Sequence, residues 1–116
     1  MAIRIKRAYE PSSPDDGTRI LVDRVWPRGV TREKLQIQSW MKEVAPSTPL
    51  RQEFCHDPEK WDAFIHSYFI ELDGKFDQVS RLLEIASHGT LTLVFGAKDV
   101  TYNQAAALKQ YLESKQ

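Results

Sequence analysis

The sequence predicts an α/β protein in which helices cover a mostly parallel central sheet within a single compact domain. Short apolar, β-branched segments lie near both ends of the chain, and helical segments lie between them. No repeat, linker or low-complexity stretch interrupts the sequence. The 116 residues provide material for one hydrophobic core. We therefore expect residues 1–116 to form one domain.

Three segments are predicted to be strands. The first is Ala2–Ala8, in which apolar and charged residues alternate as in a half-buried strand. The second is Arg19–Val25, whose consecutive apolar residues are typical of a central strand covered on both faces. The third is Thr90–Phe95. The loop Tyr9–Gly17 is short for a right-handed crossover, so the pairing of the first two strands stays open.

The middle of the chain begins with short elements. A capped turn is expected over Thr31–Leu35. Gln36–Glu43 is compatible with a strand or a helix, and a strand is favoured. A short helix is expected over Thr48–Phe54, because Thr48 suits an N-cap and Pro49 suits the first helical position.

Three longer helices are predicted after these elements. Asp57 and Pro58 introduce the first, which Gly74 breaks or kinks. The second spans Asp77–His88 and stops at Gly89, and the third spans Asn103–Ser114 and closes the domain. The apolar residues of the first helix recur at helical spacing and are Trp61, Phe64, Ile65, Tyr68, Phe69 and Leu72.

Composition limits the cellular location and the partners. The chain has one cysteine, no signal-like N-terminal segment and no apolar run of about 20 residues, so a soluble cytoplasmic protein without a membrane partner is expected. The net charge is zero, but Met1–Lys34 carries eight basic against five acidic residues and Glu53–Glu84 carries three against eight. The pI of about 6.8 argues against nucleic acid as the partner, because a protein that binds nucleic acid usually has a basic pI.

Charged residues follow the second and the last predicted strand, at the end of the sheet where α/β proteins bind ligands. If the two strands are parallel neighbours, these residues converge on one edge. Cations beside an aromatic ring suit a phosphate or a carboxylate, because guanidinium groups bind such anions through paired hydrogen bonds. The alternative is a structural network in which Asp23 pairs with Arg24 or Lys98 and Trp26 lies in the core. The residues of this predicted rim are Asp23, Arg24, Trp26, Arg28, Lys98 and Asp99.

A second group of reactive residues precedes the first long helix. His56 is either a general acid or base, since imidazole titrates near neutral pH, or a histidine that hydrogen-bonds the backbone at the helix entry. Cys55 is expected to be a buried inert thiol and Asp57 an N-cap. The three histidines and one cysteine have no metal-ligand spacing, and the chain has no phosphate-binding glycine loop or Gly-x-Ser-x-Gly turn. No metal or cofactor is therefore expected.

Five segments resemble one bacterial family. They are IKRAY at Ile5–Tyr9, LVDRVWPRG at Leu21–Gly29, WMKEVAPS at Trp40–Ser47, FCHDPEKW at Phe54–Trp61 and AKD at Ala97–Asp99. In this order they resemble the YeaO-like proteins (domain of unknown function 488) over nearly the whole chain. The resemblance implies an α/β fold with an aspartate–arginine motif at the end of a central strand, and it implies no particular activity.

The chain departs from the family pattern at two places. The resemblance implies glycine where this chain has Cys55, which argues against a shared cysteine nucleophile. It also implies His-Asn-His where this chain has Tyr102-Asn103-Gln104, so only Asn103 is carried over as a ligand-binding candidate and histidine-based metal binding is not.

Two functions from different classes are compatible with these residues. The first is an enzyme acting on a small anionic metabolite that bears a phosphate or a carboxylate. The second is a non-catalytic module that senses a ligand or docks a partner at the same rim. Candidate proton-transfer residues are Asp23, His56 and Asp99, and candidate ligand-binding residues are Arg24, Trp26, Arg28, Lys98 and Asn103.

Overall fold

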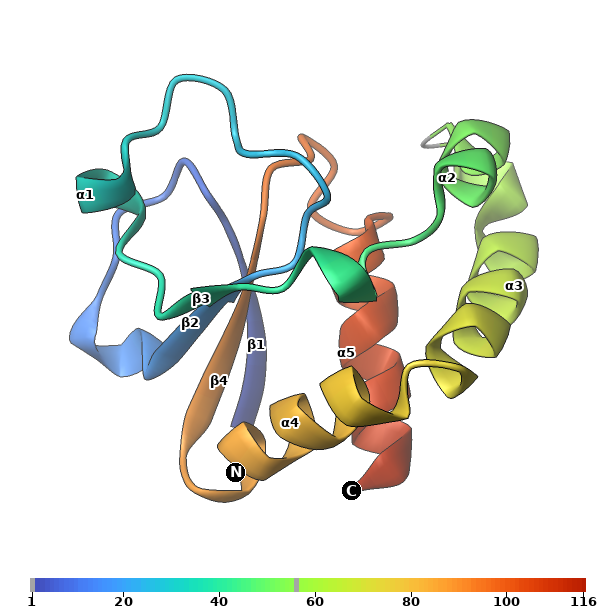
Figure 1. Ribbon diagram of the computed structural model, residues 1–116. Helices are drawn as coiled ribbons and strands as arrows, with labels where there is room; N and C mark the ends of the chain where they lie inside the picture. The colour runs from blue at the N-terminus through green and yellow to red at the C-terminus, as the bar shows by residue number, and fades with distance from the viewer. Residues whose placement is uncertain (1, 56) are drawn as a thin grey trace.

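A computed structural model describes residues 2–55 and 57–116, and it confirms the α/β fold. The described strands form one parallel sheet in the order β1-β4-β2-β3 (Figure 1). The strand bounds are Ala2–Arg7 for β1, Thr18–Leu21 for β2, Ser39–Trp40 for β3 and Thr90–Phe95 for β4. The first two strands of the chain do not pair with each other, because β4 lies between them.

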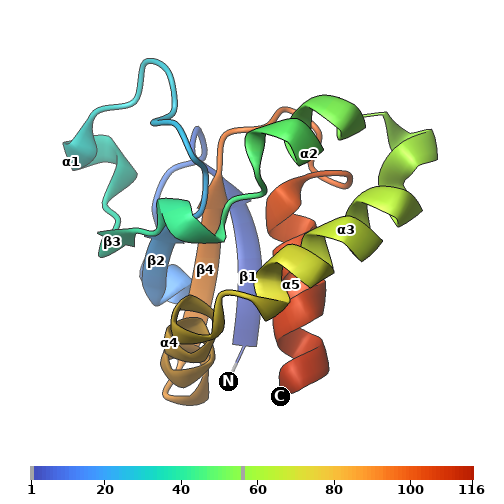
Figure 2. The same ribbon diagram turned by 45° about the vertical axis from the view of Figure 1, so that its right-hand side comes forward.

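The helices lie mainly on one face of the sheet. Helices α4 and α5 pack against the strands, and α3 and α2 lie farther out, while α1 lies on the other side (Figures 1 and 2). No helix in the described part of the chain is long and apolar enough to cross a membrane. The helix bounds are Arg32–Leu35 for α1, Thr48–Phe54 for α2, Trp61–Asp73 for α3, Phe76–Ser87 for α4 and Gln104–Lys115 for α5. Single 3₁₀ turns span Pro14–Asp16, Lys42–Val44 and Pro58–Lys60.

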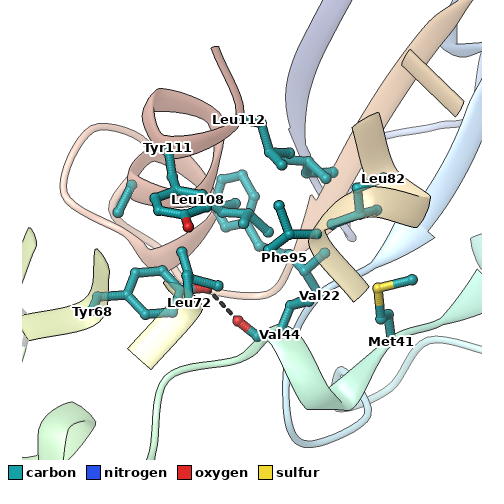
Figure 3. Close-up of a cluster of buried hydrophobic side chains, with 14 of the residues drawn as sticks. Val22, Met41, Val44, Tyr68, Leu72, Leu82, Phe95, Leu108, Tyr111 and Leu112 are labelled. Atoms are coloured by element: carbon teal, nitrogen blue, oxygen red, sulfur yellow. Dashed lines mark hydrogen bonds between the residues drawn. The ribbon is translucent and has the colours of Figure 1, made fainter. Parts of the chain in front are cut away.

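Two hydrophobic clusters lie on opposite faces of the sheet, because successive side chains of a strand point to opposite faces. Leu93 and Phe95 of β4 belong to the large cluster under the helices, and Val94 between them belongs to the small one. Figure 3 shows part of the large cluster, in which the Tyr68 hydroxyl donates a hydrogen bond to the Val44 carbonyl. The face opposite the helices is thus only partly covered, by α1, a 3₁₀ turn and loops.

Several predicted bounds need correction. Strand β2 ends at Leu21, although the Val22 N–H still donates to the Val94 carbonyl at 3.0 Å. The favoured strand in Gln36–Glu43 reduces to two residues of β3, and a 3₁₀ turn follows it. The N-cap of α2 is Ser47, whose hydroxyl accepts the Leu50 N–H, and Thr48 is already helical.

The apolar side of α3 is buried as predicted at its centre and half-buried at its start. Phe64, Tyr68 and Leu72 are buried, whereas Trp61 and Ile65 remain partly accessible. Trp61 packs against the large cluster without being enclosed by it, and its ring lies edge-on to Tyr102 and stacks on Phe64.

A cluster of ion pairs around a buried carboxylate lies on the face of the sheet opposite the helices. The fully buried Asp16 carboxylate accepts hydrogen bonds from Arg19 of β2 at 2.7 Å and from Lys6 of β1 at 3.1 Å. The Asp16 carbonyl accepts the Thr92 hydroxyl of β4 at 2.6 Å. Arg19 also donates to the Leu35 carbonyl at the end of α1 at 2.7 Å. Asp16 therefore links three strands and a helix.

Substitution of Asp16 tests this cluster. Asp16→Asn leaves the buried Arg19 and the partly buried Lys6 without a counter-charge and is expected to lower the free energy of unfolding by about 3–5 kcal/mol. Urea denaturation at pH 7 measures the change. Asp15→Asn, a substitution at an exposed neighbour, is the control and should change stability by less than about 0.5 kcal/mol. Equal effects of the two substitutions would contradict the proposed role.

The same carboxylate predicts an acid-sensitive fold. Burial raises the pKa of Asp16, but hydrogen bonds from Lys6, the Ser13 N–H and Arg19 outweigh burial, so the folded-state pKa lies below its ordinary value of 3.8. A lowered folded pKa stabilises the protein above the unfolded pKa, and this contribution is lost as the pH falls through the folded pKa. Wild-type stability should therefore drop below about pH 3.8, and Asp16→Asn should lose this part of the pH dependence in denaturation curves.

Candidate functional site

A small pocket lies at the carboxyl ends of β2 and β4, which are parallel neighbours as the predicted rim requires. We call it the strand-end pocket. Its volume is about 140 Å³, and the residues that matter below are Asp23, Arg24, Ala45, Pro46, Arg51 and Gln104. The loop after β2, the segment before α2, helix α2 itself and the start of α5 all contribute to its wall.

Asp23 joins the elements around the pocket. Its carboxylate accepts the Gly96 N–H at 2.7 Å and a hydrogen bond from the Gln104 side chain. Its carbonyl accepts the Trp40 indole N–H at 2.7 Å. A Cβ at position 96 would lie only 3.0 Å from the Asp23 carboxylate, so glycine permits this close approach. Asp23 thereby holds together the ends of β2 and β4 and the first residue of α5.

Arg24 reaches across the pocket to backbone carbonyls. One terminal nitrogen donates to the carbonyls of Ala45 and Pro46, both at 3.2 Å. Its Nε is buried without a hydrogen-bond partner among the described residues. All ion pairs between described residues involve Asp16, so the alternative of an Asp23–Arg24 ion pair is not found there. Part of the hydrogen-bonding capacity of Arg24 is thus unused.

The carbonyls that Arg24 contacts belong to a segment that α3 and its flanking loop hold in place. Glu71 accepts the Ser47 N–H at 2.9 Å and the Ser47 hydroxyl at 2.5 Å. Lys75 donates to the carbonyls of Glu43 and Ala45, and burial lowers the pKa of Lys75. The pocket wall over Ala45 and Pro46 is therefore fixed by side chains that lie outside the pocket.

Among the lining residues that sequence reasoning missed, Arg51 is the charged one. It lies in the middle of α2, its side chain is exposed, and it makes no side-chain hydrogen bond or ion pair with the described part of the chain. No motif marks it, because its relevance depends on how α2 folds back toward the strand ends. The pocket thus contains two arginines and one carboxylate, and the carboxylate is already bound by two donors.

The predicted residues after β4 build the start of α5. Asp99 accepts the N–H groups of Thr101 and Tyr102, both at 2.9 Å. Asn103 is fully buried and is the N-cap of α5, accepting the Ala106 N–H at 2.8 Å. Lys98 is exposed and directly follows Ala97, which lines the pocket. Asp99 and Asn103 therefore have backbone partners and do not line the strand-end pocket.

Trp26 and Arg28 lie away from this pocket. The Trp26 indole donates to the Val30 carbonyl at 2.6 Å and packs edge-on against Trp40, with ring centroids 5.4 Å apart, on the face opposite the helices. The Arg28 side chain is exposed, and neither residue lines the pocket.

The segment before α3 differs in part from expectation. Cys55 is exposed, not buried as expected, and it is the C-cap of α2, in a left-handed conformation with φ of 49°. Asp57 is an N-cap as predicted and accepts the Glu59 N–H at 3.0 Å. His56 lies outside the described residues. Among residues 2–55 and 57–116, no three histidine, cysteine or acidic side chains come together to hold a metal.

A larger hollow of about 600 Å³ lies at the opposite end of β2 and β4. Its wall carries Arg81 and Glu84 of α4 and His88, the residue that directly follows this helix. We assign the candidate site to the strand-end pocket, because α/β sheets bind ligands beyond the carboxyl ends of their strands. In addition, the Arg51 side chain in its wall has no hydrogen bond or ion pair to residues 2–55 and 57–116.

Two arginine substitutions test which arginine stabilises the fold. Arg24→Ala removes the donor of two pocket carbonyls and should lower the free energy of unfolding by about 1–3 kcal/mol. Arg28→Ala alters an exposed side chain and should change the free energy of unfolding by less than about 0.5 kcal/mol. Equilibrium denaturation of both variants provides the comparison. A larger loss for Arg28→Ala than for Arg24→Ala would show that this description of the two arginines is wrong.

Comparisons with known proteins agree on one family. A family model described as the inactive DUF488-N3 subclade matches residues 2–116. The uncharacterised protein YeaO of Escherichia coli K12 is 41% identical over 114 residues, which cover 98% of this chain and 99% of that protein. The uncharacterised proteins Mb3100c of Mycobacterium bovis and Rv3073c of Mycobacterium tuberculosis are each 36% identical over 113 residues, covering 97% of this chain and 95% of theirs. No solved structure matches the chain significantly. The chain therefore belongs to the YeaO-like DUF488 family.

Proposed function

We propose that the protein is a non-catalytic binding module that takes a small anion, a phosphate or a short carboxylate, in the strand-end pocket. The observation that carries the proposal is the pair of arginines in the wall. The Arg51 side chain makes no hydrogen bond or ion pair with a described residue, and Arg24 has a buried Nε without a hydrogen-bond partner in the described part of the chain. Guanidinium groups bind phosphate and carboxylate through paired hydrogen bonds.

The size of the pocket supports a small ligand. Its volume of about 140 Å³ is below the range of roughly 300–1,000 Å³ that holds drug-sized ligands. At about 30 Å³ for each water in the liquid, it has the capacity of four or five waters. Inorganic phosphate or a carboxylate of two or three carbons fits such a space. Lys98 adds a further cation beside the lining residue Ala97.

The carboxylates near the pocket support binding and not catalysis. Asp23 already accepts two hydrogen bonds that hold β4 and α5, and Asp99 accepts two backbone N–H groups at the start of α5. A general base must be able to approach the proton that it removes, whereas these carboxylates already accept hydrogen bonds from backbone N–H groups and from the Gln104 side chain. The description of the matching subclade as inactive supports the same choice.

Calorimetric titration with inorganic phosphate and with acetate tests the proposal. At least one anion should bind the wild type, and a ligand that binds only the folded state should also raise the melting temperature. Arg51→Gln should weaken binding at least about tenfold, which corresponds to about 1.4 kcal/mol, with unchanged stability because its side chain is exposed.

Arg28→Gln is the matched control, since it removes an exposed cation that does not line the pocket. It should leave the affinity within about twofold. The proposal would be overturned if neither phosphate nor acetate binds the wild type, or if the wild type and Arg51→Gln have equal affinity.

A further inference from the structure

A second pocket lies between the loop after β1 and the loop before α1. Its volume is about 410 Å³, and its wall includes Tyr9, Glu10, Pro11, Gly29, Val30 and Lys34. None of its lining residues lines the strand-end pocket. Its volume falls within the roughly 300–1,000 Å³ that is usual for sites of small organic ligands. We call it the Tyr9 pocket.

The Tyr9 ring is accessible to solvent but held in place. Its exposed fraction is 48%. Its hydroxyl donates to the Arg28 carbonyl at 3.0 Å, and the Arg7 guanidinium lies 4.9 Å from the ring centroid. Arg7 is itself anchored, because its Nε donates to the Ala97 carbonyl at 2.9 Å. An exposed aromatic ring that is fixed at its hydroxyl and by a neighbouring cation is a preorganised surface for stacking.

The rest of the wall of the Tyr9 pocket combines an apolar part, an open part and two charged residues. Pro11 and Val30 provide apolar surface. Gly29 has a φ of 79°, and a Cβ placed there would meet nothing within 4 Å, so the wall at this residue is open. Lys34 supplies an exposed cation, and Glu10 supplies an exposed carboxylate that can accept hydrogen bonds from amino or hydroxyl groups.

We infer that the Tyr9 pocket binds a nucleoside monophosphate, with the base stacked on Tyr9 and the phosphate near Lys34. An aromatic platform beside a cation recognises a planar ring that carries a negative group, and bases stack on aromatic side chains whatever their identity. Glu10 disfavours a phosphate on its own side and suits the ribose hydroxyls or a base amino group. The near-neutral pI favours a free nucleotide over a nucleic acid strand, which usually needs a basic surface.

Titration of the purified chain with AMP, adenosine and inorganic phosphate tests this inference. AMP should bind more tightly than either adenosine or phosphate. Tyr9→Ala should weaken AMP binding by about 5- to 150-fold, the range for loss of one base–aromatic stack. Tyr9→Phe keeps the ring and should remain within about threefold of the wild type. Far-UV circular dichroism of each variant confirms that the fold is retained.

Lys34→Gln tests the contribution of the phosphate separately from that of the nucleoside. It should weaken AMP but leave adenosine unchanged, so that the preference for AMP disappears. Arg51→Gln, at the strand-end pocket, should leave AMP binding unchanged, which separates this inference from the proposed anion site.

Three results would overturn the inference: no AMP binding at millimolar concentration, AMP binding that survives Tyr9→Ala, or tighter binding of an eight-nucleotide single strand than of AMP. The last result would assign the pocket to nucleic acid instead of a free nucleotide.

Discussion

The sheet depends on one buried carboxylate, Asp16. Helices cover one face of the four strands, while the other face carries only a small hydrophobic cluster, a short helix and loops. On that face β1 and β2 lie on either side of β4 and cannot bond to each other. Asp16 connects them through Lys6 and Arg19, and its carbonyl binds Thr92 of β4. This polar cluster stabilises the face of the sheet that no layer of helices covers. The buried Asp16 carboxylate is tolerated there because two cationic side chains donate hydrogen bonds to it.

The candidate anion site follows from the strand order that this cluster maintains. Since β2 and β4 are adjacent and parallel, the residues after both strands meet, and Asp23 can accept the Gly96 N–H. The same carboxylate binds Gln104 and so sets the start of α5. Arg24 then fixes the carbonyls of the segment before α2, and α2 carries Arg51 to the pocket. The carboxylates of Asp23 and Asp99 thus accept hydrogen bonds that build the site, whereas the exposed Arg51 side chain makes no hydrogen bond or ion pair with a described residue.

The two proposed sites differ in the interaction that would select a ligand. The strand-end pocket is small and charged, so under the proposal ligand size and anionic groups would decide what binds. The Tyr9 pocket is larger and offers an aromatic face with partly apolar walls, so stacking decides there. Arg7 touches both regions, because its guanidinium lies over Tyr9 and its Nε binds the carbonyl of Ala97, a lining residue of the other pocket.

The sequence by itself determined the features that depend on local interactions. Alternation and apolar runs located β1, β2 and β4, helical spacing located α3 to α5, and Asp57 could be recognised as a cap, because period and capping involve residues only a few positions apart. The pattern also placed Asp23 and Arg24 directly after β2, and it placed them beside the end of β4 on the condition that the two strands are parallel neighbours, which the structure shows. The tertiary structure alone decided that β4 separates β1 from β2, that Trp26 packs on the opposite face and that Arg51 lines the pocket. These outcomes depend on which distant segments pack together, and a local pattern carries no information about the lateral order of strands or the direction in which a helix folds back.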